Sequence, residues 1–316
     1  MRAIKLTFSI TAPEDNMEQF PRIFVPIVTS FDQKGKVYGA GIKSVISYLH
    51  DFDIHGVWLL GSYGSFPLLT PDERMEVAEI AVSYGAQLGT TTIVNVGSPA
   101  TRISVDLAIH AESIGADAIA AVVPFYYSGT FYQNDNILDF FRVLVQSVSL
   151  PVIFYNNFKA TGFDPNRQLI EQLSKLGVSG LKDKGDYPSM AENFTAIKSH
   201  NQKSIYLSGT TSVQLQGHLI GSSGVTSGTA LAAPRLVTAL QSALDSNNII
   251  EAVRLQNLIL RVRNYMGRYS GRAISAYDTL TESGVDVGTC RSPWIRLSHK
   301  QAREVVSEIR AVEKLL

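Results

Sequence analysis

The chain of 316 residues has a single cysteine, Cys290, and no apolar run long enough to cross a bilayer. One cysteine excludes an internal disulfide framework and a cluster of metal-binding thiolates, and it fits a reducing compartment. The nearest approach to a spanning segment is residues 116–125, which is shorter than the roughly 20 residues required and contains Asp117. The sequence therefore predicts a cytoplasmic protein that does not span a membrane.

The chain also lacks net charge, with 28 Lys and Arg against 28 Asp and Glu. It has no dense basic run with interleaved aromatic residues, so we do not expect nucleic acid as a partner. The six histidines show no metal-ligand spacing, such as two histidines four positions apart on one helix, and we expect no metal site. With 45% hydrophobic and 18% charged residues, the composition is typical of a soluble α/β enzyme.

Short β-rich runs alternate with longer amphipathic stretches along most of the chain. We expect eight strands, at residues 23–28, 56–60, 92–96, 118–123, 152–155, 179–182, 205–208 and 224–227. We expect eight helices between and after them, at residues 41–51, 71–84, 101–114, 136–147, 166–176, 188–198, 212–220 and 234–244. Eight such units with nearly unbroken apolar strands predict an α/β fold, a (β/α)8 TIM barrel. The alternative is a doubly wound open sheet, but no glycine fingerprint follows the first strand.

The pattern divides the chain into three parts. Residues 1–19 carry two basic residues before a small apolar patch but no convincing cleavage site, so we interpret them as a lead-in, with a targeting segment as the alternative. Residues 20–245 are expected to form the barrel. From residue 246 the β character disappears, and residues 249–265, 273–282 and 301–315 read as helices. We therefore expect residues 246–316 to be a C-terminal helical extension packed on the barrel.

Two consecutive strand–helix units carry a tyrosine and a lysine at their strand ends. The apolar run 150–154 ends in Tyr155-Asn156, and the run 178–181 ends in Lys182-Asp183. The carboxyl ends of barrel strands are where active sites lie. Desolvation there, with Lys184 on the same strand face, would favour the neutral amine of Lys182, which can attack a keto group while a phenol carries protons. An ordinary surface or ion-paired lysine is the alternative.

The loop after the second strand, Gly61-Ser62-Tyr63-Gly64-Ser65, combines two glycines with two hydroxyls and a phenol. Its backbone N–H groups could converge on a small anion such as a carboxylate. A tight turn without a ligand is the alternative interpretation.

Several segments together resemble the dihydrodipicolinate synthase and N-acetylneuraminate lyase superfamily. They occur in the order of that superfamily from about Phe24 to Arg291-Ser292-Pro293. The segments are Gly61-Ser62-Tyr63-Gly64-Ser65 with Leu69-Thr70-Pro71-Asp72-Glu73-Arg74, then Pro124-Phe125-Tyr126-Tyr127, Tyr155-Asn156 with Ala160-Thr161-Gly162, and Gly180-Leu181-Lys182-Asp183.

The resemblance implies a (β/α)8 barrel with a C-terminal helical extension that forms a homo-oligomer, a tetramer or a dimer. It implies that neither a metal nor an organic cofactor is needed. Lys182 matches the lysine that forms a Schiff base with pyruvate or another 2-keto acid. Tyr155 matches the tyrosine that moves protons to and from the reacting oxygens.

The resemblance also implies further site residues. Ser62 and Tyr63 match the pair that binds the carboxylate of the keto acid. Tyr126 matches a tyrosine that some members lend across a subunit interface, where it acts in catalysis. Gly209 and Thr226 match positions that line the same pocket.

The chain departs from the usual pattern at several of these positions. Tyr63 stands where the second threonine of Gly-Thr-Thr-Gly-Glu is usual, and Ser65 stands where the glutamate is usual. Ala160 replaces the arginine with which dihydrodipicolinate synthases hold the carboxylate of their second substrate. Ala160-Thr161-Gly162 resembles instead the 2-keto-3-deoxygluconate aldolases of archaeal type. Thr210-Thr211 replace the acidic residue with which those enzymes bind sugar hydroxyls, so we expect an aldehyde half that is shorter, less polar or held differently.

These observations predict a class I aldolase or lyase that makes or breaks a C–C bond in a 2-keto acid, with a 2-keto-3-deoxy sugar acid as the expected substrate. Its partners would be a small keto acid and an aldehyde. Dihydrodipicolinate (4-hydroxy-tetrahydrodipicolinate) synthase, N-acetylneuraminate lyase and a dehydratase of the same superfamily remain open alternatives. A non-catalytic barrel that binds a keto acid is the alternative from a different class.

Overall fold

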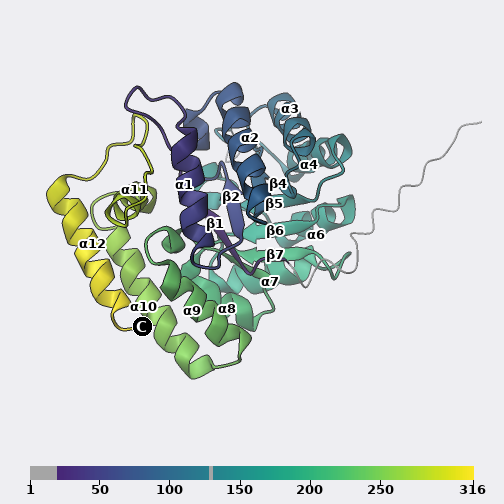
Figure 1. Ribbon diagram of the computed structural model, residues 1–316. Coiled ribbons are helices and arrows are strands. Elements are labelled where there is room, and N and C mark those ends of the chain that lie inside the picture. Colours follow the sequence, from purple (N-terminus) through teal and green to yellow (C-terminus); the bar gives the residue numbers. More distant parts are fainter. Residues whose placement is uncertain (1–19, 128–130) are drawn as a thin grey trace, which may run out of the picture.

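The structure is a computed structural model that describes residues 20–127 and 131–316. Within these residues, eight parallel strands form a closed barrel in which each strand pairs with the next and β8 pairs with β1 (Figure 1). The strands are β1 (Ile23–Pro26), β2 (Gly56–Leu59), β3 (Thr91–Asn95), β4 (Ala118–Ala121), β5 (Val152–Asn156), β6 (Gly180–Asp183), β7 (Ile205–Ser208) and β8 (Gly224–Thr226). The predicted (β/α)8 TIM barrel is confirmed.

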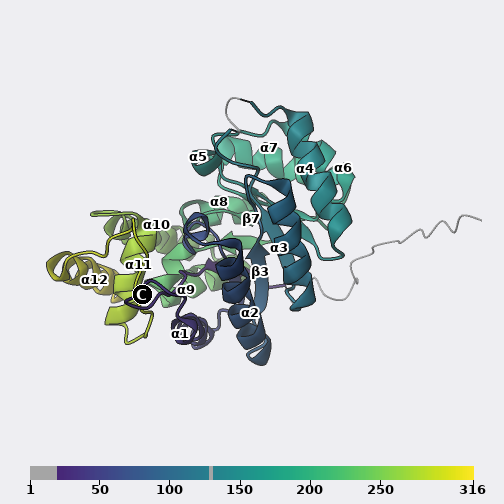
Figure 2. The same ribbon diagram turned by 90° about the horizontal axis from the view of Figure 1, so that it is seen from above.

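Helices follow the strands and cover the outside of the barrel (Figures 1 and 2). They are α1 (Gly39–His50), α2 (Pro71–Gln87), α3 (Thr101–Ser113), α4 (Asn134–Ser147), α6 (Arg167–Leu176), α7 (Tyr187–Ile197), α8 (Gln214–Leu219) and α9 (Pro234–Asp245). The start of α2 shows how local chemistry sets a boundary. The side chain of Thr70 accepts the N–H of Glu73, while Glu73 accepts the N–H of Thr70, and Pro71 takes the first helical position.

Four short elements interrupt the loops at the carboxyl ends of the strands. They are η2 (Phe66–Leu68), α5 (Phe158–Thr161), η3 (Thr211–Val213) and η4 (Gly228–Leu231). The sequence did not predict α5, because a single turn is too short to show helical periodicity. Several strand ends also differ by one or two residues from the bounds expected from the sequence. Inter-strand hydrogen bonding, and not composition, defines these ends: β1 ends at Pro26 and β4 at Ala121.

After α9 the chain forms the helices α10 (Ile249–Met266), α11 (Arg272–Glu282) and α12 (His299–Glu313). They lie together on one side of the barrel in both ribbon views, with α10 against α9 and α12, and α11 against α12 and η4. The hydroxyl of Tyr277 in α11 donates a hydrogen bond to the carbonyl of Thr29, 2.6 Å away in the loop after β1. The C-terminal helices therefore contact the end of the barrel where the strands finish. None of the helices in the described residues is both long and apolar enough to span a bilayer.

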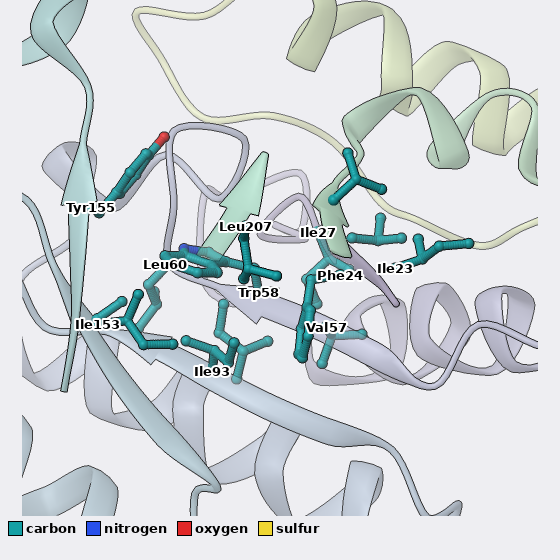
Figure 3. Packing of buried hydrophobic residues seen from close by; sticks show 14 of the residues in the cluster. Ile23, Phe24, Ile27, Val57, Trp58, Leu60, Ile93, Ile153, Tyr155 and Leu207 are labelled. Carbon is teal, nitrogen blue, oxygen red and sulfur yellow. The ribbon is translucent and has the colours of Figure 1, made fainter. Parts of the chain in front are cut away.

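The barrel interior is filled by side chains from several strands, and Figure 3 shows part of this packing around Trp58. Tyr155 stands at the edge of that group, with its hydroxyl pointing away from the packed carbon atoms (Figure 3). Trp58 and Tyr155 are among the largest fully buried side chains of the described chain. The packed core thus forms the floor beneath the carboxyl ends of β5 and β6.

Candidate active site

Lys182 and Tyr155 lie side by side on the interior of the barrel. They are direct partners in the β5–β6 register, so their side chains share a face. The Nζ atom of Lys182 lies 4.0 Å from the centre of the Tyr155 ring and 3.8 Å from the centre of the Trp58 ring. Trp58 comes from β2, on another part of the barrel wall. The structure thus brings the two predicted residues together and adds an aromatic face below the amine.

The amine of Lys182 is held in an environment that disfavours positive charge. Its side chain is only 2% exposed, and it has no hydrogen bond or ion pair with any residue of the described part of the chain. Burial lowers the pKa of Lys182 well below the ordinary value of 10.5, and the nearby charge of Lys184 lowers it further. A larger fraction of this amine is therefore neutral near pH 7 than for an exposed lysine, and the neutral form is the nucleophile.

The hydroxyl of Tyr155 belongs to a triangle of polar groups. It lies 3.3 Å from the Oγ atom of Ser62, and the side-chain N–H of Asn157 donates to it over 3.2 Å. The same amide lies 3.4 Å from Ser62 Oγ. Asn157 follows Tyr155 by two positions and so emerges on the same face of the chain. Two hydrogen-bonding partners therefore fix the direction of the Tyr155 hydroxyl, and Ser62 can pass a proton to or from it.

The loop that carries Ser62 is held by two buried side chains. Thr29 donates to the carbonyl of Gly64 over 2.6 Å, and Asn95 donates to the carbonyl of Leu60 over 2.8 Å. The backbone N–H groups of Ser62 and Tyr63 donate to no other group among the described residues. Two free N–H groups in one loop can donate to a carboxylate, and anion binding by this loop stays a prediction.

A buried carboxylate fixes the strand end that carries Lys182. Asp183 is fully buried and accepts hydrogen bonds from four donors. The donors are Asn156 Nδ2 at 3.0 Å, Asn193 Nδ2 at 2.9 Å, the Tyr206 hydroxyl at 2.9 Å and the Gly185 N–H at 2.8 Å. Burial, together with the charge of Asp183, raises the pKa of Tyr206, so this phenol stays a donor. The network joins β5, β6, α7 and β7 around the residue next to Lys182.

The side chain of Tyr63 forms no hydrogen bond with Tyr155, Ser62 or Asn157 in the described residues. Its ring packs so closely on Gly228 that a Cβ atom there would lie 2.4 Å from the ring carbon Cζ. Burial raises the pKa of Tyr63, against the opposing charges of Arg263 and Arg272 from the C-terminal helices. Tyr63 is therefore a neutral phenol that faces those helices. Its backbone N–H, and not its side chain, is the group that could bind an anion.

Gly209 and Thr226 lie at the ends of neighbouring strands, β7 and β8. The N–H of Gly209 donates to the carbonyl of Asp183 over 2.6 Å, and a Cβ atom at Gly209 would lie 2.6 Å from Cγ of Lys184. The hydroxyl of Thr226 is buried and without a hydrogen-bond partner in the described residues. Neither residue forms a hydrogen bond or ring contact with the Lys182–Tyr155 pair in the described chain.

Tyr126 lies on the outside, with 86% of its surface exposed. Its φ angle of 83° is in the left-handed region that a residue with a bulky side chain rarely adopts. Its ring centre is 4.8 Å from that of Tyr127, whose ring centre is in turn 5.5 Å from that of Phe131. Within a single chain, the structure does not bring Tyr126 to Lys182 or Tyr155.

Both hydrogen-bonding partners of the Tyr155 hydroxyl, Ser62 and Asn157, line a pocket of about 320 Å³, whereas Lys182 and Tyr155 are not among its lining residues. Ala160 also lines it, at the position where the resemblance would place an arginine. The space next to the candidate proton carrier can therefore accept a second molecule.

Sequence reasoning did not assign roles to Trp58 and Asn157. The period-two pattern of a strand could have identified Asn157, since it places that residue on the face of Tyr155. No local signal identifies Trp58, because its contact with Lys182 joins β2 to β6 across the barrel.

Known proteins support this assignment of fold and point to one family. A sequence model of the dihydrodipicolinate synthetase family matches residues 19–312. The chain is 32% identical to a DapA-like lyase of Halobacterium salinarum over 85% of this chain and 86% of that protein. It is 28% identical to the Escherichia coli protein named "Probable 2-dehydro-3-deoxy-D-pentonate aldolase YjhH", over 78% of this chain and 81% of that one. The crystal structure of Escherichia coli YagE in complex with pyruvate shares the fold, with a TM-score of 0.87 at 22% identity over 93% of this chain and 99% of YagE.

Proposed function

Because the chain belongs to the dihydrodipicolinate synthetase family, and is thereby an enzyme of the class I aldolase and lyase superfamily, we propose that Lys182 forms a Schiff base with pyruvate or another 2-keto acid. The observation that carries this proposal is the buried amine of Lys182, 4.0 Å from the ring of Tyr155 and with a lowered pKa. The resemblance of the segment Gly180-Leu181-Lys182-Asp183 and the burial of the amine both support this lysine.

The reaction follows from these groups. The neutral amine of Lys182 attacks the keto carbon, and Tyr155 gives its proton to the hydroxyl of the carbinolamine, which leaves as water and yields an iminium ion. When the C3–C4 bond breaks, its electron pair moves into the iminium and forms an enamine, while Tyr155 takes the proton of the C4 hydroxyl and an aldehyde leaves. Protonation of the enamine at C3 and hydrolysis by water release the keto acid and free the lysine. Condensation runs through the same steps in reverse.

The carboxylate of the keto acid would bind at the loop of residues 61–65. The backbone N–H groups of Ser62 and Tyr63 supply two donors there, while the side chain of Ser62 remains in contact with the Tyr155 hydroxyl. This arrangement would orient the keto carbon toward Lys182 and leave C4 facing Tyr155.

We propose a 2-keto-3-deoxy sugar acid as the substrate. The name of the relative YjhH supports this class of substrate. Ala160 lines the pocket beside Tyr155, where an arginine would be needed to hold the carboxylate of a charged second substrate. An uncharged aldehyde, such as the one released from a sugar acid, therefore fits this pocket better than aspartate semialdehyde.

Borohydride trapping with pyruvate tests the proposed function. We expect mass spectrometry to find a reduced pyruvate adduct on Lys182 in the wild-type protein and none in Lys182→Ala. An adduct with no C–C bond cleavage of any 2-keto-3-deoxy acid would favour a barrel that only binds keto acids. Absence of an adduct on Lys182 would reject the Schiff-base proposal.

We further propose that the enzyme works in the cytoplasm as a homo-oligomer. The exposed rings of Tyr126, Tyr127 and Phe131 form a contiguous aromatic surface, of a kind that monomeric proteins seldom leave in water. The strained backbone of Tyr126 suits a side chain that must reach a neighbouring subunit. Light scattering coupled to gel filtration is expected to show a dimer or tetramer, and Tyr126→Ser is expected to weaken it.

A further inference from the structure

The pocket lined by Ser62 and Asn157 is mostly apolar. Its polar lining comes from Ser62, Ser65, Asn157 and Thr161, of which Ser62 and Asn157 are the two partners of the Tyr155 hydroxyl. The remaining wall is apolar and has no charged side chain among the described residues. Apart from Ala160, this wall consists of Phe66, Pro67, Leu68, Val122, Phe125 and Trp294.

Hydrogen bonds and ring packing fix the shape of the apolar wall. Trp294 belongs to the segment that follows Arg291, and the guanidinium of Arg291 donates to both carboxylate oxygens of Glu73 at 2.6 and 2.7 Å. The same guanidinium donates to the carbonyl of Leu68, 3.1 Å away, and so joins the Trp294 segment to the segment of Leu68, which also lines the pocket. The rings of Phe66 and Phe125 meet edge to face, with 5.7 Å between their centres.

The position of the pocket decides which part of a substrate enters it. In the proposed reaction, the hydroxyl on C4 must lie against the hydroxyl of Tyr155, because that group takes its proton. The chain beyond C4 then extends past Ser62 and Asn157 along the apolar wall. A hydroxyl or a carboxylate placed there would lose its water without gaining a partner, which is costly for the hydroxyl and more so for the charge.

We propose that this pocket selects aldehydes that are uncharged and have an apolar tail, in preference to polyhydroxylated or acidic aldehydes. The inference rests on the proposed Schiff-base function and narrows its substrate to those 2-keto-3-deoxy acids, within the class proposed above, whose chain beyond C4 carries the fewest hydroxyls. In the condensation direction, C3 of the lysine-bound enamine attacks the aldehyde carbon. The aldehyde oxygen takes the proton from Tyr155 and becomes the C4 hydroxyl, and water hydrolyses the iminium to release a 4-hydroxy-2-keto acid.

Three aldehydes of four carbons each separate the possibilities. Purified wild-type protein is given pyruvate with butyraldehyde, erythrose or succinic semialdehyde, which carry an alkyl, a polyhydroxylated and an acidic tail. We expect kcat/KM for butyraldehyde to exceed both others by at least about tenfold, the scale on which a pocket discriminates such tails. A preference for erythrose or succinic semialdehyde overturns the inference, and so does the absence of a preference or of any condensation.

Two variants of Ala160 test whether this pocket determines the preference among aldehydes. Ala160→Arg is expected to raise kcat/KM for succinic semialdehyde relative to butyraldehyde by at least about tenfold, since it supplies a fixed positive charge. Ala160→Met adds similar bulk without charge and should not do so. An unchanged ratio in Ala160→Arg would mean that the aldehyde does not lie in this pocket.

Pyruvate trapping keeps the two proposals apart. If borohydride gives an adduct on Lys182 while the aldehyde preference fails, only the pocket inference is rejected. If no adduct forms on Lys182, the proposed function itself fails.

Discussion

The amine of Lys182 lies over the face of Trp58, with 3.8 Å between Nζ and the centre of the ring. Two effects oppose one another at this contact. Burial disfavours the protonated amine, whereas the negative face of an indole stabilises a nearby cation. Burial has the larger effect on the free enzyme, because the pKa of Lys182 is lowered. Once the amine has reacted, its nitrogen becomes part of an iminium ion, and the ring face then stabilises the cation that the reaction requires.

Replacing Trp58 by leucine should therefore weaken the iminium. A cation–π contact contributes about 0.5–2 kcal/mol, so the pyruvate concentration for half-maximal borohydride trapping should rise about 2- to 30-fold. Trp58→Phe keeps an aromatic face and should lie between wild type and Trp58→Leu. Equal trapping by all three folded proteins would show that the indole serves only to fill the core.

Lys182→Met should abolish activity and stabilise the fold. Loss of the nucleophile is expected to lower kcat by roughly a thousandfold or more. The gain in stability comes from removing a buried amine whose pKa is lowered on folding. Below the lowered pKa, the lysine is protonated in both states and the folded state bears the full cost of burying the charge. Between that pKa and 10.5, only the unfolded state keeps the proton, so wild-type stability rises with pH.

The stability difference between Lys182→Met and wild type should thus be largest below the lowered pKa and shrink as the pH rises from there toward 10.5. Urea unfolding at several pH values measures this difference.

Lys184→Met tests the influence of the neighbouring charge. The charge of Lys184 contributes to the lowered pKa of Lys182, so its removal should move the acid limb of the kcat/KM profile to higher pH. An acid limb that stays in place would contradict the assigned influence of Lys184.

The sequence was sufficient for the barrel and for the pair at its centre. The alternation of apolar runs with amphipathic stretches predicted all eight strands. A tyrosine and a lysine at the ends of consecutive strands become neighbours in any parallel barrel. The contact between Trp58 and Lys182 depends on how side chains from β2 and β6 fill the interior, and no sequence pattern encodes that distance. The turn of Tyr63 toward Gly228 likewise depends on the C-terminal helices, which lie far along the chain.

Asn157 should act as a positioning residue for Tyr155. Its amide donates to the Tyr155 hydroxyl over 3.2 Å, and one such bond contributes about 0.5–1.5 kcal/mol, so Asn157→Ala should lower kcat about 2- to 12-fold. Because the carboxylate site on the loop of residues 61–65 is untouched, the KM for the keto acid should change little. Steady-state kinetics separates the two constants. A rise in KM with unchanged kcat would assign Asn157 to substrate binding instead.

Asp183→Asn should destabilise the carboxyl end of β6. The carboxylate accepts from Asn156, Asn193, Tyr206 and the N–H of Gly185, and an amide in its place has one acceptor atom and one donor group. About two buried donors would lose their acceptor, at about 1–3 kcal/mol each, so the free energy of unfolding should fall by about 2–6 kcal/mol. Tyr206→Phe removes a single donor and should cost about 1 kcal/mol. Denaturant unfolding compares the two variants with wild type. A different result would be that Asp183→Asn is no less stable than Tyr206→Phe. That result would show that the four hydrogen bonds do not hold Lys182 in place. Its position would then depend on the packing of Trp58 and Tyr155 alone.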